Sequence, residues 1–119
     1  MASRSRSKGN IDRRRHPTTE GLKALAGSYP ALDAPSVQRV RAAGAIPIGR
    51  TNLANTAVRW HTDSELWGAT VNPWDRRRTP GASNGGEPAA LATGMSPLGL
   101  GSDRLGSLRW PAQFCGIGE

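Results

Sequence analysis

The chain has 119 residues, enough for one small domain but too few for two. Its hydrophobic share of 36% lies below the usual range, and its 15 glycines and 9 prolines favour turns over core. No apolar stretch approaches the roughly 18 residues that a membrane helix needs, so we expect no membrane association. These features predict a thin hydrophobic core and many turns.

Basic residues give the chain a net charge of +7 and gather in two clusters. The first lies within residues 1–15, and the second is Arg76-Arg77-Arg78. Such clusters attract polyanions, but the sequence has neither zinc-finger spacing nor an aromatic RNA-binding motif. Nucleic acid is therefore the less favoured partner, and solvated surface is the preferred interpretation of both clusters.

Cys115 is the only cysteine, so an internal disulfide cannot form. A lone cysteine fits a reducing compartment, and we expect a cytoplasmic protein. The two histidines, His16 and His61, do not have the spacing of a metal site with this cysteine. We therefore expect no metal and no cofactor.

Residues 1–20 show no apolar periodicity, and Ile11 is their only large aliphatic residue after Met1. This pattern predicts loop or disorder. We therefore divide the chain into a basic, disordered N-terminus over residues 1–7 and a folded domain over residues 8–119.

A helix is predicted after a turn-rich link over residues 22–33. Asp33 is a candidate N-cap, Pro35 suits the first helical turn, and Gly44 suits the C-terminal stop. The next segment, residues 45–48, has a strand pattern, and its proline favours an edge position in a sheet.

Three of the four tryptophans fall within residues 54–75. We expect their rings to pack over the loop that leads to Ser83, because burying a large ring is favourable. The alternative is an aromatic platform for single-stranded nucleic acid, on which successive bases would stack.

Two serines stand in glycine-bearing turns. Ser83 lies within Gly81-Ala82-Ser83-Asn84-Gly85-Gly86, and Ser107 follows Asp103-Arg104-Leu105-Gly106. A helix pattern over residues 87–92 and a strand pattern over residues 97–100 separate them. Glycines allow sharp turns and let successive amide N–H groups point into one concavity, as a developing oxyanion requires.

This stretch resembles the amidase signature family, the serine hydrolases that cleave carboxamides. The family pattern is Gly-Gly-Ser-Ser-Gly-Gly, a helix, a strand, and then Asp-x-Gly-Gly-Ser-[apolar]-Arg-[apolar]-Pro-Ala-x-x-Cys-Gly. Ser83 matches the bridging serine and Ser107 the nucleophilic serine, with the family's separation of 24 residues. Upstream, residues 8–12 and 17–21 are similar to the family's lysine segment, which places Lys8 on the catalytic lysine.

The resemblance implies an α/β fold, here the signature core with a partial mixed sheet flanked by helices. It implies a relay in which neutral Lys8 accepts a proton from Ser83, and Ser83 accepts one from Ser107. Ser107 then attacks the carbonyl of a small carboxamide and forms an acyl-enzyme, which water releases as an acid. The implied oxyanion donors are the backbone N–H groups of Arg104, Leu105, Gly106 and Ser107. A cis peptide is implied at the Ala82–Ser83 bond.

The chain departs from the family pattern at several positions. Ala82 and Leu105 stand where the family has glycine, and a leucine at position 105 is costly if its φ is positive. The apolar strand that precedes the family's lysine is replaced by Ser3-Arg4-Ser5-Arg6-Ser7. A solvated lysine has a pKa of about 10.4. We therefore expect Lys8 to stay protonated and hydrolysis to be slow or lost.

Family members are several hundred residues long, and the resemblance covers only their signature core. We expect a fragment, a truncated gene product or half of an assembly, in which self-association or a partner chain completes the sheet. The second hypothesis is a non-catalytic remnant that binds polyanions through the two basic clusters. Salt separates the hypotheses, because phosphate binding weakens steeply with salt and hydrolysis of a neutral amide does not.

Overall fold

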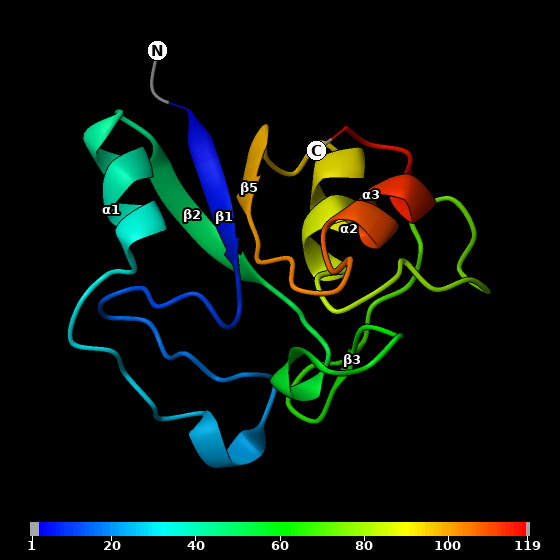
Figure 1. Cartoon of the computed structure of the whole chain (residues 1–119), viewed down its shortest axis with the longest axis horizontal. Coiled ribbons are helices and arrows are strands. Elements are labelled where there is room, and N and C mark those ends of the chain that lie inside the picture. Colours follow the sequence, from blue (N-terminus) through cyan, green and yellow to red (C-terminus); the bar gives the residue numbers. More distant parts are fainter. Residues whose placement is uncertain (1–2, 119) are drawn as a thin grey trace.

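The computed structural model describes residues 3–118, which form three short α-helices, five strands and two turns of 3-10 helix. The main sheet has three parallel strands in the order β2-β1-β5, and a small antiparallel pair, β3-β4, lies apart from it. The α/β class predicted from the sequence is confirmed. Figure 1 shows α1 beside β2 at one end of the sheet, and α2 and α3 together beyond β5 at the other.

The central strand of the sheet is β1, Arg4–Lys8, so the loop or disorder predicted for this basic segment is wrong for residues 4–7. The strand pairs with both neighbours, and its register shifts between Ser5 and Arg6. Ser5 and Ser7 are buried, because a short serine side chain fits beneath packed elements although it is polar. Residues 1–2 of the expected disordered segment lie outside the described residues.

The edge strand β2, Ile46–Thr51, is longer than the predicted segment and carries Pro47 at the sheet edge, as expected. The preceding helix α1 spans Pro35–Ala42, buries Val37 and ends before Gly44, whose φ of 88° suits a helix stop. Asp33 is not the N-cap that the sequence predicts. Its carboxylate instead accepts a hydrogen bond from the Arg14 N–H at 2.7 Å and pairs with Arg41 at 3.1 Å.

The helix α2, Gly86–Ala92, packs against all three strands of the main sheet. The strand β5, Leu98–Leu100, follows it, and both elements match the predicted patterns closely. The last helix, α3, spans Arg109–Cys115 and ends at Gly116, which is left-handed with a φ of 67°. It packs against α2 through its buried face.

The intervening segment holds the 3-10 turn η2 at Asn55–Ala57 and the strands β3, Asp63–Ser64, and β4, Gly68–Ala69. The other 3-10 turn, η1, spans Lys23–Leu25. The tryptophans of this segment do not pack as the sequence predicts. Trp60, Trp67 and Trp74 are 66–70% exposed.

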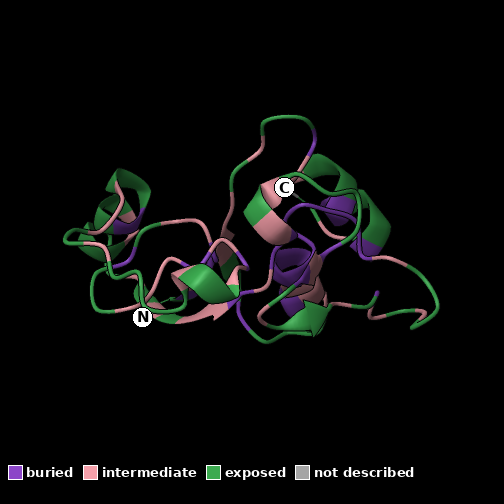
Figure 2. Cartoon of the chain, turned by 90° about the horizontal axis from the view of Figure 1, so that it is seen from below, coloured by how far each residue is buried: buried purple, intermediate pink, exposed green. Residues whose placement is uncertain are grey.

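The predicted thin core is confirmed. Figure 2 shows buried residues gathered around α2 and the sheet, with exposed surface over most of the remaining chain. The buried hydrophobic residues are mostly small: Val37, Leu53, Ala54, Ala82, Ala90, Ala112 and Cys115. Polar side chains are buried beside them, and these polar residues form the site described next.

Candidate active site

Ser83 lies in a tight loop just before α2 and is 2% exposed. The peptide bond that precedes it, Ala82–Ser83, is cis, as the resemblance implies. Two glycines after it have no room for a side chain. A Cβ on Gly85 would lie 2.5 Å from the Gly81 carbonyl oxygen, and one on Gly86 would lie 2.5 Å from the Asn52 carbonyl oxygen. The sequence Gly-Gly therefore lets this loop approach its neighbours closely.

Ser107 lies in the loop between β5 and α3, and its Oγ accepts a hydrogen bond from Ser83 Oγ at 3.0 Å. The carboxylate of Asp103 holds this loop in place. It accepts hydrogen bonds from the backbone N–H groups of Gly106, Leu108 and Arg109 and pairs with the Arg109 guanidinium at 3.0 Å. The Arg109 side chain and these N–H groups hold the pKa of Asp103 well below its usual range.

Lys8 ends β1, is 1% exposed, and donates from Nζ to Ser83 Oγ at 2.8 Å. Burial lowers the pKa of Lys8 to about 8, although the charges of Glu20 and Asp103 oppose the shift. The structure therefore contradicts the expectation of a solvated lysine. About a tenth of the molecules carry the neutral amine at pH 7.

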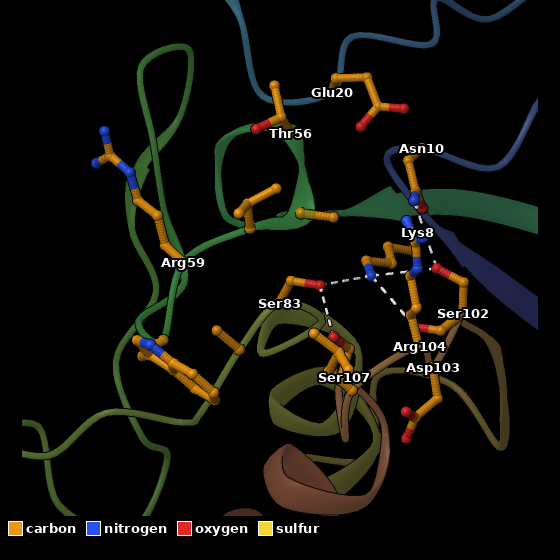
Figure 3. A pocket seen from close by; sticks show the side chains of 15 residues that line it. Lys8, Asn10, Glu20, Thr56, Arg59, Ser83, Ser102, Asp103, Arg104 and Ser107 are labelled. Carbon is orange, nitrogen blue, oxygen red and sulfur yellow. Dashed lines mark hydrogen bonds between the residues drawn. The ribbon is translucent and has the colours of Figure 1, made fainter.

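The structure thus brings all three predicted relay residues into one line of hydrogen bonds, as Figure 3 shows. Lys8 comes from the central strand, Ser83 from the loop before α2, and Ser107 from the loop before α3. Their positions are fixed by three segments that are far apart in the sequence.

The four predicted oxyanion donors share the loop at residues 104–107. The Gly106 N–H donates to Asp103 Oδ1 at 2.6 Å, so it is already engaged within the loop. Gly106 has a φ of 101°, whereas Leu105 is not among the non-glycine residues with positive φ. The predicted cost of leucine at this position is therefore absent, and its side chain is 77% exposed.

A cavity of about 680 Å³ opens beside the two serines and Lys8. Its wall combines apolar groups, among them Val58, Trp60 and Leu105, with the charged groups of Glu20 and Arg104. The Trp60 ring also stacks on Trp110, with ring centroids 5.0 Å apart. A small molecule in this cavity would meet the Ser107 hydroxyl directly.

Sequence reasoning missed two residues of this site. Ser102 accepts hydrogen bonds from Lys8 Nζ, and Asp103 clamps the Ser107 loop. Asp103 could have been found, because a carboxylate just before a glycine turn commonly accepts the turn's N–H groups. Ser102 carries no comparable signal, since its contact with Lys8 joins residues 94 positions apart.

The histidines lie away from the two serines. His16 contacts Arg13 at 2.8 Å, and His61 contacts Thr79 at 2.8 Å. Among residues 3–118, no group of three or more histidine, cysteine, aspartate or glutamate side chains is arranged to hold a metal ion. Within the same residues, no helix is long and apolar enough to cross a bilayer.

A sequence model of the family named Amidase matches residues 7–118, nearly the whole chain. The chain belongs to the amidase family. One relative, from the glutamyl-tRNA(Gln) amidotransferase of Methanococcoides burtonii, is 46% identical over 110 residues, which are 92% of this chain and 23% of that protein. The amidase resemblance drawn from the two serine motifs is therefore confirmed.

Solved structures of amidase relatives share the fold. 6-Aminohexanoate cyclic dimer hydrolase superposes with a TM-score of 0.92 at 37% identity, covering 96% of this chain and 24% of that chain. Peptide amidase from Stenotrophomonas maltophilia superposes with a TM-score of 0.88 at 32% identity, covering 92% and 23%. The chain thus spans about a quarter of the length of the relatives it matches.

Proposed function

We propose that this chain is the catalytic core of a serine amidohydrolase that cleaves the C–N bond of a carboxamide. The observation that carries the proposal is the line of hydrogen bonds from Lys8 through Ser83 to Ser107, which ends at the wall of the cavity. A serine hydroxyl is a weak nucleophile and needs a base. The buried amine of Lys8 is suited to that role when it is neutral.

The protonation state of Lys8 sets the direction of the hydrogen bonds. When Lys8 is charged, it donates to Ser83, and Ser83 donates to Ser107, so the nucleophile retains its proton. When Lys8 is neutral, both hydroxyls can turn, so that Ser107 donates to Ser83 and Ser83 donates to Lys8. The second arrangement is the productive one, because it carries a proton away from Ser107.

In the proposed reaction, Ser107 Oγ attacks the amide carbon while its proton passes to Ser83 and the Ser83 proton passes to Lys8. The tetrahedral intermediate collapses when Lys8 returns a proton through Ser83 to the leaving nitrogen. The C–N bond then breaks, and ammonia or an amine leaves an acyl group on Ser107. Water releases the acid through the same relay run again.

The negative oxygen of the intermediate needs N–H donors beside Ser107. The Gly106 N–H is taken by Asp103, so we assign the role to the N–H groups of Arg104, Leu105 and Ser107. Loss of one such donor costs about 2.7–4 kcal/mol of barrier in a comparable enzyme site. The Asp103 clamp serves this function by fixing the loop.

The proposed substrate is a small amide, in keeping with the size of the cavity and with the names of the matched relatives, among them a peptide amidase and a cyclic dimer hydrolase. The polyanion hypothesis is less favoured. Arg13 and Arg50 donate to backbone carbonyl groups of the chain, and Arg77 and Arg78 both pair with Asp75. These contacts occupy part of both basic clusters.

Intact-mass spectrometry after treatment with a fluorophosphonate tests the proposal, because this reagent traps an activated serine. The expected result is a single adduct on the wild type, a slower reaction for Ser83→Ala and none for Ser107→Ala. Circular dichroism should first show that each variant is folded. A folded wild type without an adduct, or an equal adduct on Ser107→Ala, would contradict the proposal.

A further inference from the structure

The Lys8 amine has three hydrogen-bond acceptors around it, and two of them belong to one residue. Nζ lies 2.8 Å from Ser83 Oγ, 3.2 Å from Ser102 Oγ and 3.4 Å from the Ser102 carbonyl oxygen. Ser102 follows β5 and lines the same cavity as the two relay serines. Figure 3 shows Ser102 on the side of the amine away from Ser83.

The stereochemistry of an amine gives this arrangement a consequence. A charged lysine has three N–H bonds and no lone pair, whereas a neutral lysine has two N–H bonds and one lone pair. If the neutral amine is to take the Ser83 proton, its lone pair must face Ser83 Oγ and its two N–H bonds must point elsewhere. Ser102 supplies acceptors for both bonds.

We infer that Ser102 is a positioning residue, which binds both N–H groups of neutral Lys8 and so directs the amine lone pair at Ser83 Oγ. The inference rests on the proposed function of the relay. Ser102 acts through Lys8 and does not itself exchange a proton with Ser107 or the substrate.

Two neighbouring contacts hold Ser102 where this role requires it. The Asn10 amide donates to Ser102 Oγ at 3.4 Å and so occupies one acceptor position of that oxygen. Asp103, the next residue, is fixed by the N–H groups of the Ser107 loop and by Arg109. The Ser102 carbonyl is therefore anchored to the loop that carries the nucleophile.

The neutral character of Ser102 also matters. Glu20 and Asp103 already favour the charged form of Lys8. A carboxylate at position 102 would accept the same two bonds but would stabilise the ammonium further. A hydroxyl and a carbonyl orient the amine without adding a negative charge.

The chain offers an unusually direct test, because its only lysines are Lys8 and Lys23. Lysine labelled with ¹³C at Cε gives two NMR signals, and the exposed Lys23 on η1 serves as the internal reference. The Lys8 signal reports its titration whether or not the protein is active. The rate of phosphonylation of Ser107 is measured on the same samples as a function of pH.

We expect Ser102→Ala to shift the Lys8 titration to lower pH by about half a unit, because the ammonium loses an acceptor that it binds more strongly than the neutral amine does. The phosphonylation rate at high pH should fall about tenfold, as expected for the loss of one orienting hydrogen bond. Ser102→Thr keeps the hydroxyl and should recover most of both properties. Ser36→Ala, at an exposed serine on α1, is the matched control.

A Ser102→Ala protein with the wild-type Lys8 midpoint and the wild-type rate at high pH would overturn the inference. A general loss of folding would instead lower the thermal midpoint of Ser102→Ala without moving the Lys8 titration, and that pattern also counts against a positioning role. If the wild type does not react at all, the proposed function fails. The NMR titration then decides alone, since an unchanged midpoint excludes the Ser102 contact and a shifted midpoint supports it.

Discussion

At the scale of single residues, position 105 tests how the Ser107 loop accommodates this sequence. Leu105 stands where the family has glycine, yet the positive φ of the loop falls at Gly106. Leu105→Gly would add freedom to the unfolded chain without relieving strain. We expect it to lower the free energy of unfolding by about 0.4–1 kcal/mol, measured by urea denaturation.

Gly106→Ala is the matched comparison in the same loop. Its φ of 101° disfavours any side chain, and the new Cβ would lie 3.0 Å from Trp110 Nε1. We expect this substitution to cost more, about 1–3 kcal/mol. A gain in stability from Leu105→Gly would show instead that the leucine is strained.

Lys8 shows what a motif can and cannot predict about a residue. Its place in the family pattern predicted its partner, Ser83, across 75 residues. Its burial was not predicted, because its sequence neighbours include Arg4 and Arg6 while its spatial neighbours come from distant loops. The pKa of a lysine depends on that spatial environment, which only the fold supplies.

At the scale of elements, α2 carries a buried carboxyl group at Glu87, which is 2% exposed. One of its oxygens accepts a hydrogen bond from Thr51 Oγ1 on β2, and Gly99 on β5 leaves room for the other. Burial raises the pKa of Glu87 from 4.5 to about 7, although Thr51 and the charge of Arg6 oppose the shift. The side chain therefore joins the helix to the sheet as a neutral acid at low pH.

We expect the stability of the fold to fall as pH rises from 4.5 to 7. In this range the folded chain still holds the Glu87 proton that the unfolded chain has released, so folding binds a proton. The change is on the order of 3 kcal/mol. Urea denaturation at several pH values measures it.

Glu87→Gln is the control for this prediction, because it keeps the size of the side chain and removes its titration. The difference in stability between wild type and variant should depend on pH and should move in favour of the variant above pH 7. A difference that is constant from pH 4.5 to 8 would contradict the burial of an ionisable group at this position.

Predictions for whole elements succeeded where punctuation and pattern agree. Gly44 correctly marked the end of α1, and the small-residue run before Gly94 correctly predicted α2. The strand β1 could not be predicted, because its alternating serines and arginines carry no apolar signal and its pairing with β2 and β5 is non-local. The open position of the tryptophan rings depends likewise on how little of the chain packs against them.

At the scale of the molecule, the described surface holds many apolar side chains. Ile46 and Ile48 on the edge strand β2 are 53% and 41% exposed, and Trp110 and Phe114 on α3 are about half exposed. Such a surface with an open sheet edge favours association. We expect the sedimentation coefficient of the chain to rise with concentration.

Ile48→Lys places a charge on that edge and should reduce the association. Ser36→Ala, on the exposed side of α1, should leave it unchanged. A wild-type chain that sediments as a monomer at every concentration would contradict the expectation that a second chain covers these surfaces.

The central claim is that the neutral amine of Lys8 draws the proton from Ser107 through Ser83. Its most direct test is the rate of Ser107 phosphonylation between pH 6 and pH 10 for wild type and Lys8→Met. The account predicts a wild-type rate that rises with pH through a midpoint of about 8 and then levels off, since only the neutral amine accepts a proton. Lys8→Met should react at least about a hundredfold more slowly at the plateau and show no such midpoint. Equal rates for the two proteins across this range would contradict the relay.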